Sequence, residues 1–130
     1  MTKILNVVAL SLLSMGCGGS NPAGTSPSVF PPEARDPVSF TVEGTRAIMI
    51  GSLDETTPNL VANLIVDHPL VDTIVMQFVP GTTNSAVSLN AGRVIRSAGL
   101  NTAIPADGAV ASGGTDVFLA GIFREGEPGG

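Results

Sequence analysis

Thr73-Ile-Val-Met-Gln-Phe-Val79 is a nearly continuous apolar stretch, and the turn Pro80-Gly81-Thr82 ends it. A short apolar run that is bounded by turn residues predicts a strand buried on both faces of a sheet, which is typical of parallel sheets. Parallel neighbours need long crossover connections, and these are usually helices. The stretch therefore predicts an α/β fold, provided that the flanking sequence supplies the helices.

The flanking sequence alternates further strands with amphipathic helical segments. Strands are expected at 38–42, 47–50 and 101–105. One helix is expected from Thr57-Pro58, where a cap is followed by proline at the first helical position, to Asp67. A second begins at Asn84 or Ser85 and ends before Gly99, and a third covers 112–120. This order predicts one domain, residues 38–130, with a mostly parallel sheet and crossover helices.

The start of the chain carries a different signal. Lys3 precedes an apolar run, Ile4 to Met15, that is shorter than the roughly 20 residues needed to cross a bilayer. The run ends in Leu13-Ser14-Met15-Gly16-Cys17, which resembles a bacterial lipoprotein signal. The resemblance implies that residues 1–16 are a signal peptide and that Cys17 is lipidated. An uncleaved anchor, or a secretory signal in which Cys17 is incidental, is the alternative.

A lipidated Cys17 also predicts a location. The absence of an aspartate directly after Cys17 points, by the same resemblance, to the outer membrane of a bacterial envelope, facing the periplasm. Several acyl chains would hold the protein on the membrane, because each buried methylene contributes about 0.8 kcal/mol. Residues 17–37 are rich in Gly, Ser and Pro, and they are expected to form a flexible tether between lipid and domain.

Composition excludes several classes of function. The net charge of -5 and the scattered arginines argue against binding to nucleic acid. Cys17 is the only cysteine, so neither a disulfide nor a thiolate site is expected once it carries lipid. The pair Asp67-His68 has no further ligand at a suitable spacing, so we expect no metal, and nothing suggests another cofactor.

Three features together resemble the ClpP/crotonase-like superfamily, in particular its envelope branch related to Clp protease subunits. These are the strand-Pro-Gly-turn-helix around Pro80, the segment Ile95-Arg-Ser-Ala-Gly-Leu-Asn-Thr102, and Ala111-Ser112-Gly113 opening a helix. The resemblance implies a serine-peptidase-like site with Ser112 as nucleophile. Backbone N–H groups of Gly81 or Thr82 and of Gly113 would form the oxyanion hole. Without such a site, Ser112 is simply a helix cap, and Gly81 serves a tight turn.

The sequence departs from the family in two ways. The family turn usually reads Ser-Pro-Gly-Gly, whereas Thr82 here places a Cβ at the last position. The family's catalytic histidine lies on a strand that follows a turn like Pro128-Gly129-Gly130, where this sequence ends. The resemblance therefore implies a partial fold whose C-terminal part is missing, and a serine without a general base.

The sequence thus predicts an envelope lipoprotein with a catalytically inactive serine-peptidase-like domain. One alternative is an active hydrolase whose base comes from His68 or from a second subunit, and another is a non-catalytic lipoprotein that binds a peptide or carboxylate. His68 is more simply explained as a surface residue at a helix end, and Asp116 as a solvated helix charge. Beyond the membrane and such a peptide or subunit, the sequence predicts no partner.

Overall fold

The structure is a computed structural model, and it describes residues 29–82 and 84–130. The predicted signal peptide, Cys17 and most of the predicted tether lie outside these residues. None of the helices in the described part is both long enough and apolar enough to span a bilayer.

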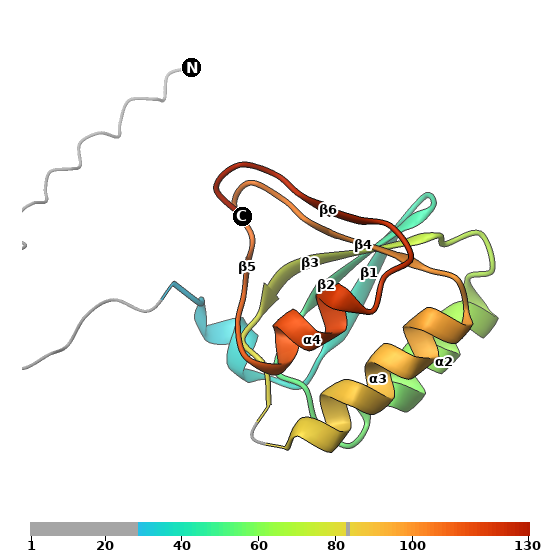
Figure 1. The fold of residues 1–130 in the computed structure, drawn as a ribbon, viewed down its shortest axis with the longest axis horizontal. Helices are drawn as coiled ribbons and strands as arrows, with labels where there is room; N and C mark the ends of the chain where they lie inside the picture. The colour runs from blue at the N-terminus through green and yellow to red at the C-terminus, as the bar shows by residue number, and fades with distance from the viewer. Residues whose placement is uncertain (1–28, 83) are drawn as a thin grey trace, which may run out of the picture.

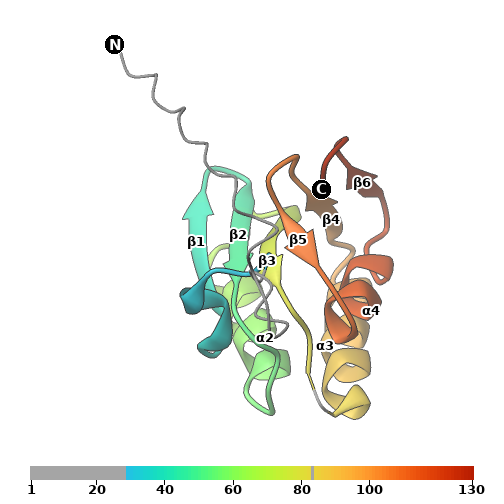
Figure 2. The same cartoon turned by 90° about the vertical axis from the view of Figure 1, so that its left-hand side faces the viewer.

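A mixed sheet with helices on one side forms the domain. The strands are β1 (Ser39–Glu43), β2 (Arg46–Ile50), β3 (Thr73–Val79), β4 (Asn101–Ile104), β5 (Ala109–Val110) and β6 (Arg124–Gly126); the helices are α2 (Thr57–Asp67), α3 (Ser85–Ser97) and α4 (Gly113–Leu119), after a short 3-10 helix η3 (Pro32–Arg35). The strand order is β1-β2-β3-β4-β6, and β5 pairs with β3 (Figure 2). β1 and β2 form an antiparallel hairpin, whereas every other pair of these strands is parallel. The predicted α/β class with a mostly parallel sheet is confirmed.

Each helix returns the chain to the start of the next parallel strand. α2 connects β2 to β3, α3 connects β3 to β4, and α4 connects β5 to β6. Figure 1 shows the three helices on the same side of the sheet. The two ends of the sheet therefore differ. The carboxyl ends of the parallel strands β2, β3 and β5 lie at one end, and the amino ends of β2 and β3 lie at the other, together with the C-termini of the helices.

The core lies between the helices and one face of the sheet. Met49, Ile74 and Met76 on the strands are fully buried, as are Val61 on α2 and Ile95 on α3. On α3, Val87, Ala91 and Ile95 are buried and Val94 is partly buried against the core, whereas Ala98 is exposed at the end of the helix. Burying these side chains is worth about 1.5–3 kcal/mol each before entropy is counted, so this layer is what holds the helices on the sheet.

One expectation needs correction, and two short strands were not predicted. The predicted tether reaches to residue 37, but Pro32–Arg35 form η3, Ala34 is fully buried, and the hydroxyl of Ser52 donates a 2.8 Å hydrogen bond to the Ala34 carbonyl. The domain thus begins before residue 38.

The short strands β5 and β6 were not predicted, because two or three residues with Gly and charged neighbours show no hydrophobic period.

The turn before α2 predicts a pH dependence of stability. The hydroxyl and the backbone N–H of Thr56 both donate to the Asp54 carboxylate, and they hold its pKa below the usual 3.8. A lowered pKa in the folded state stabilises the fold above pH 3.8, and this stabilisation is lost as the pH falls through the folded-state value. We expect the melting temperature of wild type to fall below that pH more steeply than that of Asp54→Asn. Parallel pH profiles would contradict this role.

Candidate functional site

Ser112 lies in the short turn between β5 and α4, and its backbone is unusual. Its φ is 53° and its ψ is -125°, and it is the only non-glycine residue with a positive φ in the described part of the chain. Such a conformation costs about 1–3 kcal/mol and tends to occur at functional sites. A strained serine between a strand and a helix is also how α/β-hydrolases hold their nucleophile. The geometry therefore marks Ser112 as more than a loop residue.

The simple explanation of Ser112 as a helix cap is not confirmed. Its side chain makes no capping hydrogen bond to α4. The residue is exposed, and its hydroxyl has no hydrogen-bond partner among residues 29–82 and 84–130. The hydroxyl is therefore available to a ligand.

The structure brings Gly81 close to Ser112 and to its chain neighbour Gly113, as the resemblance implied. A Cβ on Gly81 would lie 2.8 Å from the backbone nitrogen of Gly113 and 2.9 Å from the Cβ of Ser112. Gly81 has a φ of +116°, and the N–H of Leu53 donates to its carbonyl at 2.9 Å, which fixes the turn against β2. Only glycine can fit this position, because it combines a left-handed φ with a close backbone approach.

The proposed oxyanion donors are uncommitted. The backbone N–H groups of Gly81, Thr82 and Gly113 donate no hydrogen bond to any residue that the structure describes. Thr82 restricts the space between them, since its Cγ2 lies 2.9 Å from where a Cβ on Gly113 would be. A cleft of about 380 Å³ opens beside the turn; residues 52, 53 and 80–82 line it, whereas Ser112 and Gly113 do not. The arrangement can accept a carbonyl or carboxylate oxygen, in a narrower space than a glycine at position 82 would leave.

No histidine or lysine that could act as a general base lies near Ser112 in the described part of the chain. His68 follows α2, and its carbonyl accepts the N–H of Val71 just before β3 begins. Ser112 lies beside Gly81, just beyond the other end of β3. Six strand steps at about 3.3 Å place the two residues roughly 20 Å apart. The one lysine, Lys3, lies outside the described residues.

Asp116 lies on α4, one turn after Ser112, and its carboxylate accepts a hydrogen bond from α3. The hydroxyl of the buried Ser88 donates to the Asp116 carboxylate at 3.2 Å and to the Ser85 carbonyl at 2.9 Å. A Cβ on Gly113 would lie 3.1 Å from the Cβ of Ser88, so this residue also supports the site from α3. The role of Ser88 cannot be predicted from the sequence, because a serine on the inner side of a helix looks like any small core residue.

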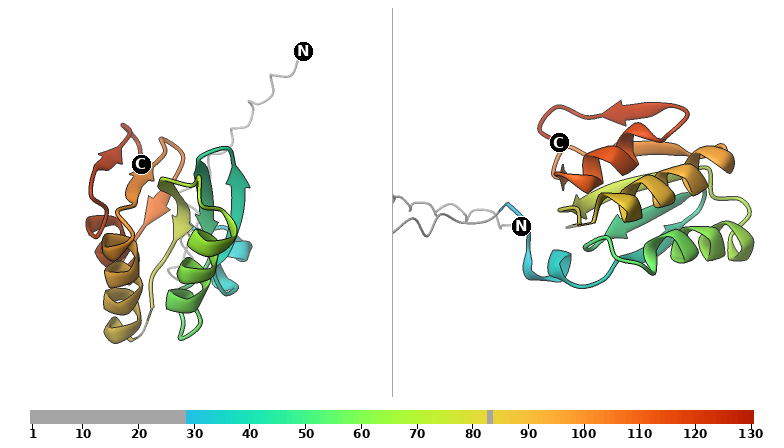
Figure 3. Two further views of the ribbon diagram at one scale, coloured as in Figure 1. Left: turned by 90° about the vertical axis from the view of Figure 1, so that its right-hand side faces the viewer. Right: turned by 60° about the horizontal axis from the view of Figure 1, so that its bottom comes forward.

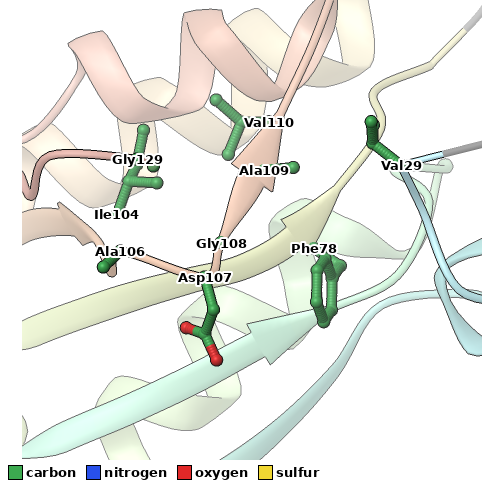
Figure 4. Close-up of a pocket in the computed structure, with 10 residues that line it drawn as sticks. Val29, Phe78, Ile104, Ala106, Asp107, Gly108, Ala109, Val110 and Gly129 are labelled. Carbon is green, nitrogen blue, oxygen red and sulfur yellow. The ribbon is translucent and has the colours of Figure 1, made fainter. Parts of the chain in front are cut away.

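A second cavity, which the sequence did not indicate, lies beside β5. It measures about 420 Å³ and is lined by Phe78, Ile104 and Val110 together with the loop around Asp107 (Figure 4). The side-chain amide of Gln77 donates to Asp107 at 2.9 Å. Ser112 is not among the residues that line this cavity. The described residues contain no cluster of His, Cys, Asp and Glu able to hold a metal ion.

Comparisons with known proteins add little to this geometry. No family model matches the chain, and no curated protein matches it. A crystal structure described as an enoyl-CoA hydratase from Streptomyces coelicolor A3(2) superposes with a TM-score of 0.48 and 16% identity, covering 85% of this chain and 51% of that one. The chain thus spans about half the length of that protein. Such a loose likeness concerns the arrangement of helices and strands, and it assigns neither family nor activity.

The strain at Ser112 predicts that Ser112→Gly stabilises the protein. Glycine adopts a positive φ without cost, but it loses more conformational entropy on folding than serine does. The net gain in the free energy of unfolding should be about 1 kcal/mol. Ser112→Ala keeps the strained backbone and should change the unfolding free energy by less than about 0.5 kcal/mol. Denaturant unfolding measures both variants. A Ser112→Gly protein no more stable than Ser112→Ala would show that the turn is unstrained.

Proposed function

We propose that the chain is a lipid-anchored envelope protein with a ClpP/crotonase-like, serine-peptidase-like domain that no longer catalyses hydrolysis. In this proposal Ser112 stands where the nucleophile stood, and the N–H groups of Gly81 or Thr82 and of Gly113 are the remaining oxyanion donors. The lipid on Cys17 attaches the domain to the membrane, on the periplasmic side of the outer membrane.

Two observations support an origin in a hydrolase. Ser112 has a strained backbone and a free hydroxyl, which a residue that merely connects β5 to α4 does not need. Gly81 approaches it closely from the turn after β3, and Gly113 is its neighbour in the chain. A nucleophile with one donor beside it in the chain and a second from a distant turn are parts that acyl transfer requires.

The proposal that the domain is inactive rests on the lack of a histidine or lysine base near Ser112. A serine hydroxyl attacks a carbonyl only when a neighbouring group removes its proton. The chain has one histidine, and it lies near the opposite end of β3; its one lysine, Lys3, leaves with the proposed signal peptide. His68 as the base is therefore disfavoured, whereas a base from another subunit and a purely binding role stay predictions.

Turnover of peptide and p-nitrophenyl ester substrates tests the proposal. We expect wild type, Ser112→Ala and His68→Ala to hydrolyse them at the same background rate. Loss of a working general base usually lowers the rate 100-fold or more, so an active enzyme would separate from the variants clearly. A wild-type rate well above that of Ser112→Ala would show an active hydrolase, and a matching loss in His68→Ala would identify the base.

A further inference from the structure

The end of the sheet opposite Ser112 carries most of the exposed apolar side chains. In the described residues seven large hydrophobic side chains are exposed, and five of them belong to this end: Val66, Leu70, Leu119, Ile122 and Phe123. Leu70 is 79% exposed and Phe123 is 75% exposed. We call these five residues, with the charged residues Asp67, Asp72, Arg96 and Arg124, the amino-end surface.

Topology explains why these residues meet. Val66 and Asp67 close α2, Leu70 and Asp72 precede β3, and the segment from Leu119 to Arg124 connects α4 to β6. The left view of Figure 3 looks onto this end, where the ends of α2 and α3, the β1–β2 hairpin and the start of β6 come together. Exposed apolar residues that gather on one face indicate an interaction surface, whereas scattered ones do not.

Charge is divided across this surface. Asp67 and Asp72 lie on the α2 and β3 side, and Arg96 and Arg124 lie on the α3 and β6 side. The pair Glu43 and Arg46 of the β1–β2 hairpin lies beside Asp72 and adds no net charge. The guanidinium groups of Arg96 and Arg124 converge on one atom, the Gly121 carbonyl oxygen, at 3.2 and 3.0 Å. Neither arginine pairs with a carboxylate of the described chain, although the protein carries eleven acidic residues. Two cations held side by side without a counterion suit a negatively charged partner.

We propose that the amino-end surface joins two copies of this chain in a two-fold dimer. A two-fold axis places the same surface against itself, so the aspartates of one copy face the arginines of the other. The apolar side chains between them are then buried. An anionic membrane would attract Arg96 and Arg124 but repel Asp67 and Asp72, so a second copy matches the division of charge better than a lipid surface does.

The dimer has a consequence for the candidate site. Ser112 lies at the other end of the sheet in each copy, so both sites remain open and face away from each other. A second copy docked in this way could not supply a base to Ser112. The proposal is independent of the function proposed above, since it concerns the opposite end of the domain.

Sedimentation velocity of the full chain, in a density-matched non-ionic detergent, tests the dimer. We expect wild type to sediment as a dimer and Asp67→Arg/Asp72→Arg to dissociate with a Kd about 10-fold higher or more, because several attractive contacts become repulsive. Glu33→Arg/Glu55→Arg is the matched control, with the same charge change away from this surface, and it should leave the dimer intact. Leu70→Ser/Phe123→Ser should weaken the dimer without changing the helix content.

Mixing variants makes the test specific. Arg96→Asp/Arg124→Asp should also be monomeric, and mixing it with Asp67→Arg/Asp72→Arg should restore a dimer, since opposite charges then face each other again. Circular dichroism checks that α4 survives the loss of Arg124. A wild type that is monomeric at every concentration, or a mixture that stays monomeric although both variants fold, would overturn the proposal. So would a monomer that binds phosphatidylglycerol vesicles through Leu70 and Phe123, because the surface would then belong to lipid.

Discussion

Gly114→Ala is expected to destabilise the domain by about 3 kcal/mol, because the added methyl group has no room. In most helices alanine is the better residue, by roughly 0.5–1 kcal/mol. Here a Cβ on Gly114 would lie only 2.3 Å from the carbonyl oxygen of Val79, a backbone atom that cannot turn aside. Val79 O also accepts the N–H of Ala111, so the displacement would reach the turn that carries Ser112.

Thermal unfolding measures this effect. For a domain of about 100 residues, 3 kcal/mol corresponds to a fall in Tm of roughly 12–24 °C. Gly126→Ala is the control, because a Cβ there meets no atom within 4 Å, and it should leave Tm nearly unchanged. Equal stability of the two variants would mean that α4 does not pack against the end of β3 as described.

Gly81→Ala is the second large effect, and it acts on the candidate site directly. The added Cβ would collide with the Ala111 carbonyl oxygen and the Gly113 nitrogen, each at 2.8 Å, while alanine is forced to a φ of +116°. The conformation alone costs about 1–3 kcal/mol, and the collisions add to it. We expect a total loss of about 3 kcal/mol or more, together with displacement of Ser112 from Gly81.

A matched control separates the two costs of Gly81→Ala. Gly44 in the β1–β2 turn has a φ of +64°, but a Cβ there meets nothing within 4 Å. Gly44→Ala should therefore lose only about 1 kcal/mol from its backbone conformation. Denaturant unfolding of the two variants gives the difference. If Gly81→Ala loses no more than Gly44→Ala, the close approach between the Gly81 turn and Ser112 is absent.

The parts of the fold that the sequence predicted well are those with a strong period or clear end signals. β3 was predicted from its apolar run, and the start of α2 from Thr57-Pro58, although the N-cap is Thr56 and Thr57 is the first helical residue. The sequence left the cap of α3 open between Asn84 and Ser85; the cap is Asn84, whose side chain accepts the N–H of Ala86 at 3.0 Å. Such local signals determine local structure without help from the rest of the chain.

The parts that were missed depend on contacts between distant residues. η3 is fixed by the bond from Ser52 to Ala34, and β5 exists only because it pairs with Phe78 and Val79 of β3. β6 exists only because it pairs with β4, as in the pair of Thr102 with Arg124. A run of two to four residues has no period of its own, so its structure is set by partners that one sequence does not reveal.

The candidate site was predicted as a set of residues but not as a geometry. The resemblance named Ser112, Gly81, Thr82 and Gly113, and the structure places all four together. The resemblance could not predict the backbone strain at Ser112, the lack of a hydrogen-bond partner for its hydroxyl in the described residues, or the position of His68. Each of these depends on how loops pack at the two ends of the sheet. The cap that a serine before a helix usually provides was the wrong expectation for this turn.

Labelling with a fluorophosphonate probe tests most directly whether Ser112 is a nucleophile without a base. The probe reacts with serines whose hydroxyl is activated, and mass spectrometry identifies the modified residue. We predict that wild type and Ser112→Ala are labelled equally, at the background level, at neutral pH. Stoichiometric labelling of Ser112 in wild type would contradict this account, because it would require a proton acceptor next to a hydroxyl that has none in the described part of the chain.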